Sequence, residues 1–467
     1  MEQPMRFERR MSDAESLMWS VEKDPSLRSS FLNLTLLDRP PHFERFRTRM
    51  ERASVLIPRL RQRVAPEPIH LAPPMWEDDP AFDLDFHVQR TSLPRPGDER
   101  ALLDLAASMY TDPFDRARPL WRFTVVEGLE DGRGALLAKM HHTITDGVGG
   151  VRLSAMFVDL EREVPDLEVP FLSPADDAGS SSFLNQVVDS LGHGVRRQLG
   201  ISRRVVAGAV DLAAHPLRLP ARASAAASAG QTLLRQALVS DHARSTLWRD
   251  KRSLGRRFEV LTVELDALKA AGKEVGGTVN DAFVAGVAGG VASYHRHHGH
   301  EVDELRMAMP VSTRSDRSAG GNAFTPTRVL VPAGIEDTRD RLTAVHQRLG
   351  EAKDDRAVAL TDAFAQLLTG LPTAVLVRLA QAQVSTVDFA VSNVRGAPFD
   401  IYIAGAHVEA NHPMGPTGGT ACNVTTLSYK NNLDIGINVD TAAIPDANVF
   451  KECIQQSFAA LIKLPIR

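Results

Sequence analysis

A basic, alanine-rich stretch at residues 184–257 divides the chain into two parts, each with a similar mixture of expected strands and helices. Of all the sequence features, this division constrains the fold most. The stretch holds thirteen Lys or Arg against four Asp or Glu. On both sides of it, runs with the two-residue period of strands are mixed with runs of helical period. Neither part alternates strictly between strand and helix, so both predict α+β sandwiches. We therefore expect an N-terminal domain 1–183, a basic helical linker 184–257 and a C-terminal domain 258–467.

The same periods predict the individual elements of both domains. Strands are expected at 120–126, 135–141, 259–265, 305–311, 327–332, 389–393, 401–408, 423–429 and 433–439. Helices are expected at 43–64 with a kink at Pro58, and at 102–110, 151–163, 279–297, 337–351 and 449–464. The pair Asp131-Gly132 predicts a hairpin turn between the first two strands.

The composition is that of a globular protein without a nucleic-acid partner. Hydrophobic residues make up 43% of the chain and charged residues 24%, as in ordinary globular proteins. The net charge of −4 gives no overall attraction to nucleic acid. Cys422 and Cys453 are the two cysteines of the chain, which excludes a disulfide scaffold and favours a reducing compartment such as the cytoplasm.

The basic stretch 184–257 has two interpretations. It is either a solvated helical linker or a basic amphipathic element on the anionic surface of the inner membrane or of a lipid droplet. No run in the chain reaches the roughly 18 apolar residues that a membrane span needs, and no apolar secretory signal is recognisable at the N-terminus. If the protein handles lipid, we expect it to meet the membrane from the side.

The run His-His-Thr-Ile-Thr-Asp-Gly at 141–147 stands at the end of a predicted strand. A ring in this place is held firmly yet open to substrate, and neutral imidazole accepts a proton near pH 7 because its ordinary pKa is about 6.5. Asp146 can fold back across the bend to orient a ring or to bind an arginine, with Arg314 and Arg395 as candidates. Gly147 permits a backbone conformation that a Cβ would disfavour.

Ordinary structural roles and metal binding are the alternatives for the histidines. Adjacent histidines at a strand end are often plain polar residues, and Asp-Gly is a common turn pair. A zinc site is disfavoured at 141–147, because the spacing is not His-Glu-x-x-His and no cysteine cluster lies nearby. A second group, at positions 295, 297, 298 and 300, stands at the end of a predicted helix, where cationic groups favour the helix dipole. We expect no metal.

The run at 141–147 resembles the signature of bacterial wax ester synthase/diacylglycerol acyltransferases, a family of the CoA-dependent acyltransferase superfamily. Other blocks resemble that family, in order and at suitable spacing, from about residue 11 to 460. They are Met-Ser-Asp-Ala-Glu at 11–15, Phe-Asp-Leu-Asp-Phe-His at 82–87, Leu-Pro-Arg-Pro-Gly at 93–97, Arg-Pro-Leu-Trp at 118–121, Asn-Asp at 280–281 and Ser-Asn-Val-Arg-Gly at 392–396. Two residues depart from the family pattern: Glu15, near which many members have Asp, and Arg395, where a proline is expected.

The resemblance implies an α+β fold of two chloramphenicol-acetyltransferase-like α/β sandwich domains, with the active-site tunnel at their interface. It also implies an O-acyltransferase that moves a fatty acyl group from acyl-CoA to a long-chain alcohol or diacylglycerol, forming wax ester or triacylglycerol. Acyl-CoA is then a co-substrate, and no cofactor is expected. Two other functions remain open: a condensation-type acyltransferase on carrier-bound substrates, and a non-catalytic lipid-droplet-binding protein.

The resemblance makes His142 the general base. His141 is expected on the other face of the strand as support, with Asp146 and Gly147 completing the motif. The thioester of acyl-CoA is already activated, and the chain contains no Gly-x-Ser-x-Gly elbow for a nucleophilic serine. We therefore expect direct transfer without a covalent acyl-enzyme.

Two polar pairs in the second half are further candidates. Asn280 and Asp281 fall in the first turn of the helix predicted at 279–297, where capping the backbone explains them as well as a place in the substrate tunnel does. Ser392 and Asn393 follow a predicted strand and have turn propensity. Their match to the family motif favours a place near the acyl or CoA tunnel.

Overall fold

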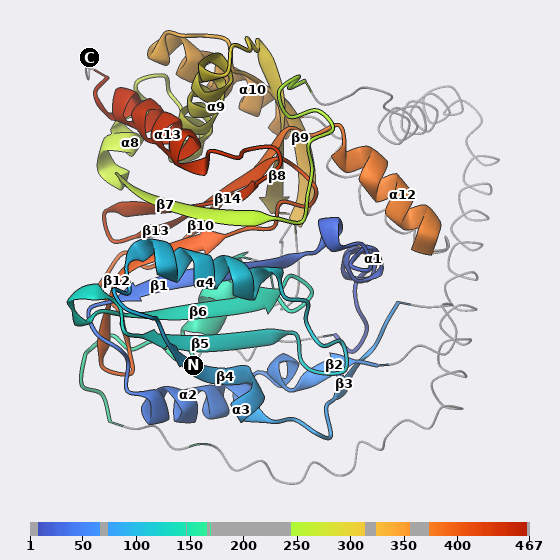
Figure 1. Ribbon diagram of the computed structural model, residues 1–467, viewed down its shortest axis with the longest axis vertical. Coiled ribbons are helices and arrows are strands. Elements are labelled where there is room, and N and C mark those ends of the chain that lie inside the picture. The colour runs from blue at the N-terminus through green and yellow to red at the C-terminus, as the bar shows by residue number, and fades with distance from the viewer. Residues whose placement is uncertain are drawn as a thin grey trace, which may run out of the picture.

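The computed structural model describes residues 8–65, 73–145, 147–165, 169, 244–312, 324–354 and 373–464. They form two six-stranded sheets, which lie one above the other in Figure 1. Helices cover the outer side of each sheet, and one helix lies between the two. This is the predicted α+β arrangement of two sandwich domains.

The lower sheet in Figure 1 contains the two strands of the predicted hairpin. Its spatial order is β11 (Tyr402–Ile403), β12 (Ala406–Met414), β1 (Ser30–Leu37), β6 (Gly134–His141), β5 (Trp121–Glu127) and β4 (Val88–Ser92). β5 and β6 are antiparallel, as the hairpin requires. β1 lies between β6 and β12 and is antiparallel to both. β1 and β6 are therefore inner strands.

Two strands of this sheet come from the C-terminal half of the chain, so the predicted domain 258–467 is not self-contained. One strand was expected at 401–408 within that domain. Instead, Ala404 and Gly405 have positive φ and form a turn between β11 and β12, and β12 pairs with β1 from the N-terminal half. An apolar pattern predicts that a segment is a strand, but it does not say which strand it pairs with.

The upper sheet belongs to the C-terminal half. Its spatial order is β7 (Arg256–Glu264), β14 (Asn432–Asp440), β13 (Cys422–Tyr429), β10 (Phe389–Arg395), β8 (Glu304–Ser312) and β9 (Phe324–Pro332). Above it in Figure 1 lie α8 (Leu265–Lys273), α9 (Val279–His297), α10 (Thr338–Asp354) and α13 (Ala447–Ile462). Glycines let α9 and α13 pack closely: a Cβ on Gly290 would lie 2.6 Å from the Cα atom of Ile454.

Six further α-helices and a small two-stranded sheet belong to the described structure, beside three short 3-10 helices at Pro25–Leu27, Pro58–Leu60 and Glu130–Gly132. The α-helices are α1 (Asp13–Val21), α2 (Phe43–Leu56), α3 (Leu84–His87), α4 (Glu99–Thr111), α5 (Gly147–Ser154) and α12 (Thr373–Val384), with β2 (Gln62–Val64) paired to β3 (Trp76–Asp78). The helix expected at 43–64 ends before Pro58, because proline disfavours helical geometry in the residue before it. The helix expected at 151–163 begins earlier and stops at Ser154, because Asp159 pairs with Tyr402 instead.

The two halves are also packed together through α4 and through α12. α4 lies between the sheets, and its apolar side chains share one buried cluster with Leu32 and Leu34 of β1 and with Phe258 and Val260 of β7. On the other side of the molecule, α12 packs against α1.

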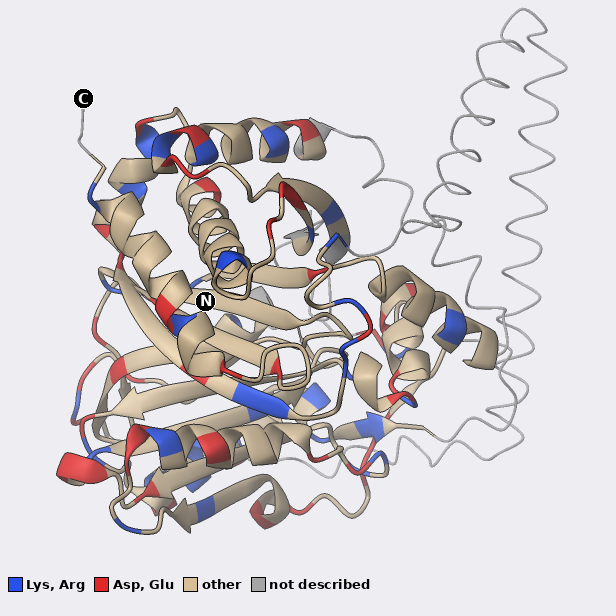
Figure 2. Ribbon diagram, turned by 45° about the horizontal axis from the view of Figure 1, so that its top comes forward, with Lys and Arg blue, Asp and Glu red and all other residues tan. Residues whose placement is uncertain are grey.

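Most of the predicted linker 184–257 lies outside the described residues, but its last part is packed into the C-terminal domain. The side chain of Trp248 is fully buried, and the backbone N–H of Ser245 donates to Asp388 (2.8 Å). The C-terminal domain therefore begins before residue 258. In Figure 2, acidic and basic residues are mixed over the described elements. None of the described helices is long and apolar enough to span a bilayer.

Candidate active site

His142 directly follows β6, at one end of the first sheet. Its backbone N–H donates to the carbonyl oxygen of Ser29 (3.0 Å), which extends the pairing of β1 with β6 by one residue. The imidazole packs on Phe31 of β1, with the ring centroids 4.8 Å apart. Nδ1 of this ring is buried although the residue is partly exposed. The predicted base therefore stands at the end of β6 with its ring against β1.

His141, in contrast, is buried and held on both ring nitrogens. The backbone N–H (3.1 Å) and hydroxyl (2.7 Å) of Thr143 both lie against Nδ1, and Nε2 lies 2.9 Å from a carboxylate oxygen of Glu22. Because a backbone N–H can only donate, Nδ1 accepts and Nε2 carries the proton that it donates to Glu22. The edges of Trp19 and Phe114 enclose the ring. His141 therefore has a structural role, with both ring nitrogens occupied by hydrogen bonds.

Glu22 is a site residue that the sequence analysis missed. Besides the His141 ring, its carboxylate accepts the backbone N–H of Ser29 (2.9 Å), and Ser29 in turn accepts the N–H of His142. Burial alone would raise the pKa of Glu22, but the hydrogen bond from His141, the Ser29 N–H and the charge of Arg28 together lower it. The ionised carboxylate therefore links both histidines. Because 119 residues separate it from His141, no local sequence pattern could have revealed it.

The rest of the motif is only partly visible. Asp146 and Arg314 lie outside the described residues, so the proposed fold-back of Asp146 stays a prediction. Gly147 begins α5, and α5 packs against β10 of the upper sheet. Arg395, the other candidate partner, ends β10 and is exposed. The motif at 141–147 thus lies where the two halves of the molecule meet.

One residue from each polar pair of the second half meets the other beside β10, the strand that α5 contacts. Nδ2 of Asn393 donates to Oδ1 of Asn280 (3.4 Å), and Nδ2 of Asn280 lies 3.7 Å from the sulfur of Met309. Ser392 is partly exposed on β10. The structure therefore brings Asn280 beside the Ser392–Asn393 strand, although 113 residues separate the two asparagines.

Asp281 serves as a helix cap, one of the two roles that the sequence left open. It forms a capping box with Thr278 at the start of α9, and its Oδ2 also lies 3.0 Å from Nδ1 of His346. The side chain is buried, with an exposed fraction of 2%. These contacts position the turn that carries Asn280. A place for Asp281 in the substrate tunnel stays a prediction.

Comparison with known proteins places the chain in a family. Residues 11–283 match the model of the wax ester synthase/diacylglycerol acyltransferase catalytic domain, and residues 320–462 match the model of the WS/DGAT C-terminal domain. The chain belongs to the wax ester synthase/diacylglycerol acyltransferase family.

Relatives cover nearly the whole chain. A putative diacylglycerol O-acyltransferase of Mycobacterium tuberculosis (strain CDC 1551 / Oshkosh) is 34% identical over 464 residues, which cover 98% of this chain and 93% of the relative. The solved structure of the wax ester synthase/diacylglycerol acyltransferase from Marinobacter aquaeolei VT8 matches with a TM-score of 0.63 at 22% identity, covering 97% of this chain and 98% of that one. A starter condensation domain of rhizomide synthetase in complex with C8-CoA matches with a TM-score of 0.57 at 14% identity, covering 97% and 94%. At these identities, the two solved structures support the fold.

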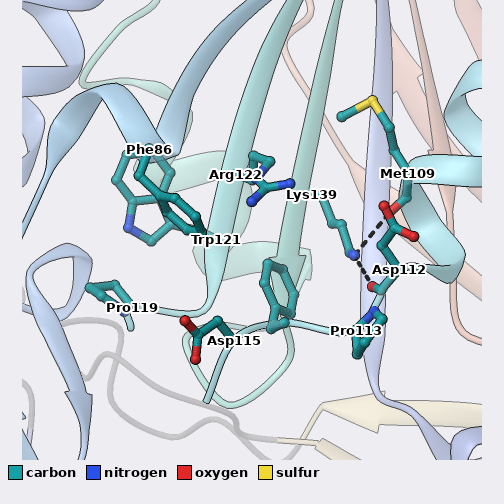
Figure 3. A pocket seen from close by; sticks show the side chains of 10 residues that line it. Phe86, Met109, Asp112, Pro113, Asp115, Pro119, Trp121, Arg122 and Lys139 are labelled. Carbon is teal, nitrogen blue, oxygen red and sulfur yellow. Dashed lines mark hydrogen bonds between the residues drawn. The ribbon is translucent and has the colours of Figure 1, made fainter. Parts of the chain in front are cut away.

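A small pocket lies beside the C-terminal end of α4 in this acyltransferase (Figure 3). Its wall includes Phe114, which contacts the His141 ring, and Trp121 of the Pro-Leu-Trp block. Lys139 donates to the carbonyl oxygens of Met109 (2.8 Å) and Asp112, so it caps the C-terminal end of α4. Burial lowers the pKa of Lys139 to about 8. The cavity volume of about 30 Å³ has room for water and not for a lipid chain.

The histidines at the end of α9 divide into two kinds. His295 is buried and bonded to Ser245 (2.7 Å) and to the Val291 carbonyl (2.8 Å), so it is a core residue. His297, His298 and Asp446 lie close enough for one ligand atom of each to be within 4.8 Å of the others. Nε2 of His298 lies 3.0 Å from Oδ2 of Asp446. A hydrogen bond at the end of the helix therefore explains why these two residues are close. The expected absence of a metal stays a prediction.

Proposed function

We propose that this protein is an acyl-CoA-dependent O-acyltransferase that makes wax ester or triacylglycerol, with His142 as its general base. The family and its relatives support the reaction, and the geometry at the end of β6 supports the base. The observation that carries the assignment is the contrast between the two histidines. His141 is buried and bonded on both nitrogens, whereas His142 is partly exposed where the two domains meet.

The reaction is a direct transfer. Nε2 of His142 takes the proton from the acceptor hydroxyl while that oxygen attacks the thioester carbonyl carbon. A carbon–oxygen bond forms and the carbonyl becomes tetrahedral. The carbon–sulfur bond then breaks, coenzyme A leaves as the thiolate, and the thiolate takes up the proton from the imidazolium. No covalent acyl-enzyme is formed, since the thioester is already activated.

Release of free thiol tests this function. The purified protein would be mixed with palmitoyl-CoA and either hexadecanol or dioleoylglycerol, and the ester product would be identified by mass. We expect thiol release that requires the acceptor and equals the ester formed. Release that is the same without acceptor, or the absence of ester, would contradict the proposal.

The similarity to condensation domains favours one second candidate, an acyltransferase on carrier-bound substrates. A palmitoyl group on a carrier protein would replace palmitoyl-CoA in the same assay, with an amine beside the alcohol as acceptor. We expect CoA thioesters and alcohols to be preferred. A higher kcat/KM with the carrier-bound thioester and the amine would favour the second candidate.

We also propose that the enzyme works on the cytoplasmic surface of the inner membrane or on lipid droplets, where its apolar acceptors collect. The net charge of +9 in the segment 184–257 supports contact with anionic lipid. Changing Arg196, Arg197, Arg203 and Arg204 to Gln should weaken co-flotation with phosphatidylserine vesicles. Unchanged flotation at low salt would refute this contact.

A further inference from the structure

A partly exposed strip crosses the middle of the first sheet, next to His142. β1 and β6 have strands on both sides, and their residues Leu32, Leu34 and Leu137 are buried in the cluster around α4. On the opposite face of these strands, Phe31, Asn33 and Ala138 are partly exposed. Asn33 lies directly opposite Ala138 in the antiparallel pairing. The strip therefore starts at the ring that packs on His142 and runs along β1.

Two asparagine side chains make this strip polar. Nδ2 of Asn33 donates to Oγ1 of Thr35 (3.0 Å) and to Oδ1 of Asn411 (3.3 Å). The Thr35 hydroxyl also donates to Oδ1 of Asn411 (2.8 Å). These bonds fix the orientation of both amides. They leave Oδ1 of Asn33 as an acceptor and Nδ2 of Asn411 as a donor, neither of which has a hydrogen-bond partner among the described residues.

The pair is held rigidly from behind. The backbone N–H of Asn411 donates to Oδ2 of Asp434 on β14 (2.7 Å), and Thr262 of β7 donates to the other oxygen of that carboxylate (2.9 Å). Asn411 thus spans the contact between the lower and upper sheets. A binding group that is anchored in this way loses little freedom when it meets a ligand.

We infer that Asn33 and Asn411 bind the first amide of the pantetheine arm of acyl-CoA. Oδ1 of Asn33 accepts from its N–H, and Nδ2 of Asn411 donates to its carbonyl oxygen. The inference rests on the proposed function, because it needs a thioester at His142. Asn33 stands two residues from Phe31, about 7 Å along the strand. In coenzyme A, the first amide is two methylene groups from the sulfur. The alcohol and diacylglycerol acceptors have a single hydroxyl, which must stand at His142 to react, so it cannot fill this pair of groups at the same time.

A pair of small thioesters tests the inference. S-palmitoyl-N-acetylcysteamine carries this amide alone, and its ketone analogue has CH₂ in place of the N–H. We expect the wild-type kcat/KM to be about tenfold higher for the amide, the effect of one hydrogen bond. In Asn33→Leu the ratio should fall to about one. In Asn33→Asp, which keeps the acceptor oxygen, the preference should remain.

The control is Asn448→Leu, which changes an exposed asparagine on α13 and should leave the ratio unchanged. A wild-type ratio near one, or a tenfold ratio that persists in a folded Asn33→Leu, would overturn the inference. Asn33→Asp covers the case in which Asn33→Leu does not fold, because loss of the amide preference in that variant would also overturn it. If neither thioester nor palmitoyl-CoA supports acceptor-dependent thiol release, the proposed function itself fails.

Discussion

At the scale of single residues, the neighbouring side chains of His141 and His142 have different surroundings. The sequence predicts that the ring of His141 supports the motif, and the structure gives it two partners, Thr143 and Glu22. The pattern at 141–147 could identify the histidines but not Glu22, because that contact depends on how α1 packs against β6. The role of His142 as the general base stays a prediction that is made from the motif.

Glu22→Gln should lower both activity and stability. The pKa of the Glu22 carboxyl is lowered in the folded state from its ordinary value of 4.5. The ionised group therefore stabilises the fold at pH 7, and this stabilisation is lost as the pH falls through the lowered pKa. We expect the substitution to cost about 1–3 kcal/mol at pH 7 and less below about pH 4. Urea unfolding at both pH values measures this.

The kinetic effect of Glu22→Gln should fall on kcat, because Glu22 positions the histidines and is not placed to touch acyl-CoA. KM for palmitoyl-CoA should stay near the wild-type value. Glu51→Gln, on an exposed face of α2, is the matched control and should change neither constant. An equal loss of stability at pH 3 and pH 7 would contradict the role given to the ionised carboxylate.

At the scale of elements, local patterns predicted most of the structure. The helix expected at 279–297 has these bounds, because Thr278 caps it and its apolar residues repeat with helical period. The strand expected at 401–408 was wrong in its bounds, since a turn at Ala404 and Gly405 divides the segment. Residue types fix local conformation well, but the turn and the pairing with β1 depend on the distant half of the chain.

Gly290→Ala tests the close approach of α9 to α13. The added methyl group would lie 2.6 Å from the backbone of Ile454, so the helices must separate, and we expect a loss of about 1–3 kcal/mol in urea unfolding. Gly350→Ala on α10 is the control. Its added methyl group meets no atom within 4 Å, and alanine should stabilise that helix by up to about 1 kcal/mol. Equal effects of the two substitutions would refute the packing argument.

At the scale of the whole molecule, the two halves form one interlocked structure. The α+β fold class follows from the sequence, and the likeness to the solved structure from Marinobacter aquaeolei VT8 confirms it. The exchange of β12 into the first sheet and the packing of α12 on α1 could not be predicted, because both are contacts between distant segments. The junction that they create holds the end of β6, α5 and β10 together.

The interlocking predicts that residues 1–183 do not fold alone. Without β12, the backbone of β1 from Leu32 to Leu37 would become an open sheet edge, and such edges promote aggregation. We expect the separate fragment to aggregate or to unfold without a cooperative transition, and to become soluble when it is co-expressed with 184–467. A monomeric fragment with a sharp urea transition would contradict this account of the junction.

The most direct measurement of the central claim is the rate of acceptor-dependent acyl transfer by His142→Ala in the full chain. A general base contributes roughly 10²- to 10⁴-fold to such a rate. We predict a loss of this size at unchanged KM and stability, while His297→Ala, an exposed change at the end of α9, retains wild-type activity. A folded His142→Ala enzyme that transfers palmitate to hexadecanol or dioleoylglycerol at close to the wild-type rate would contradict the claim.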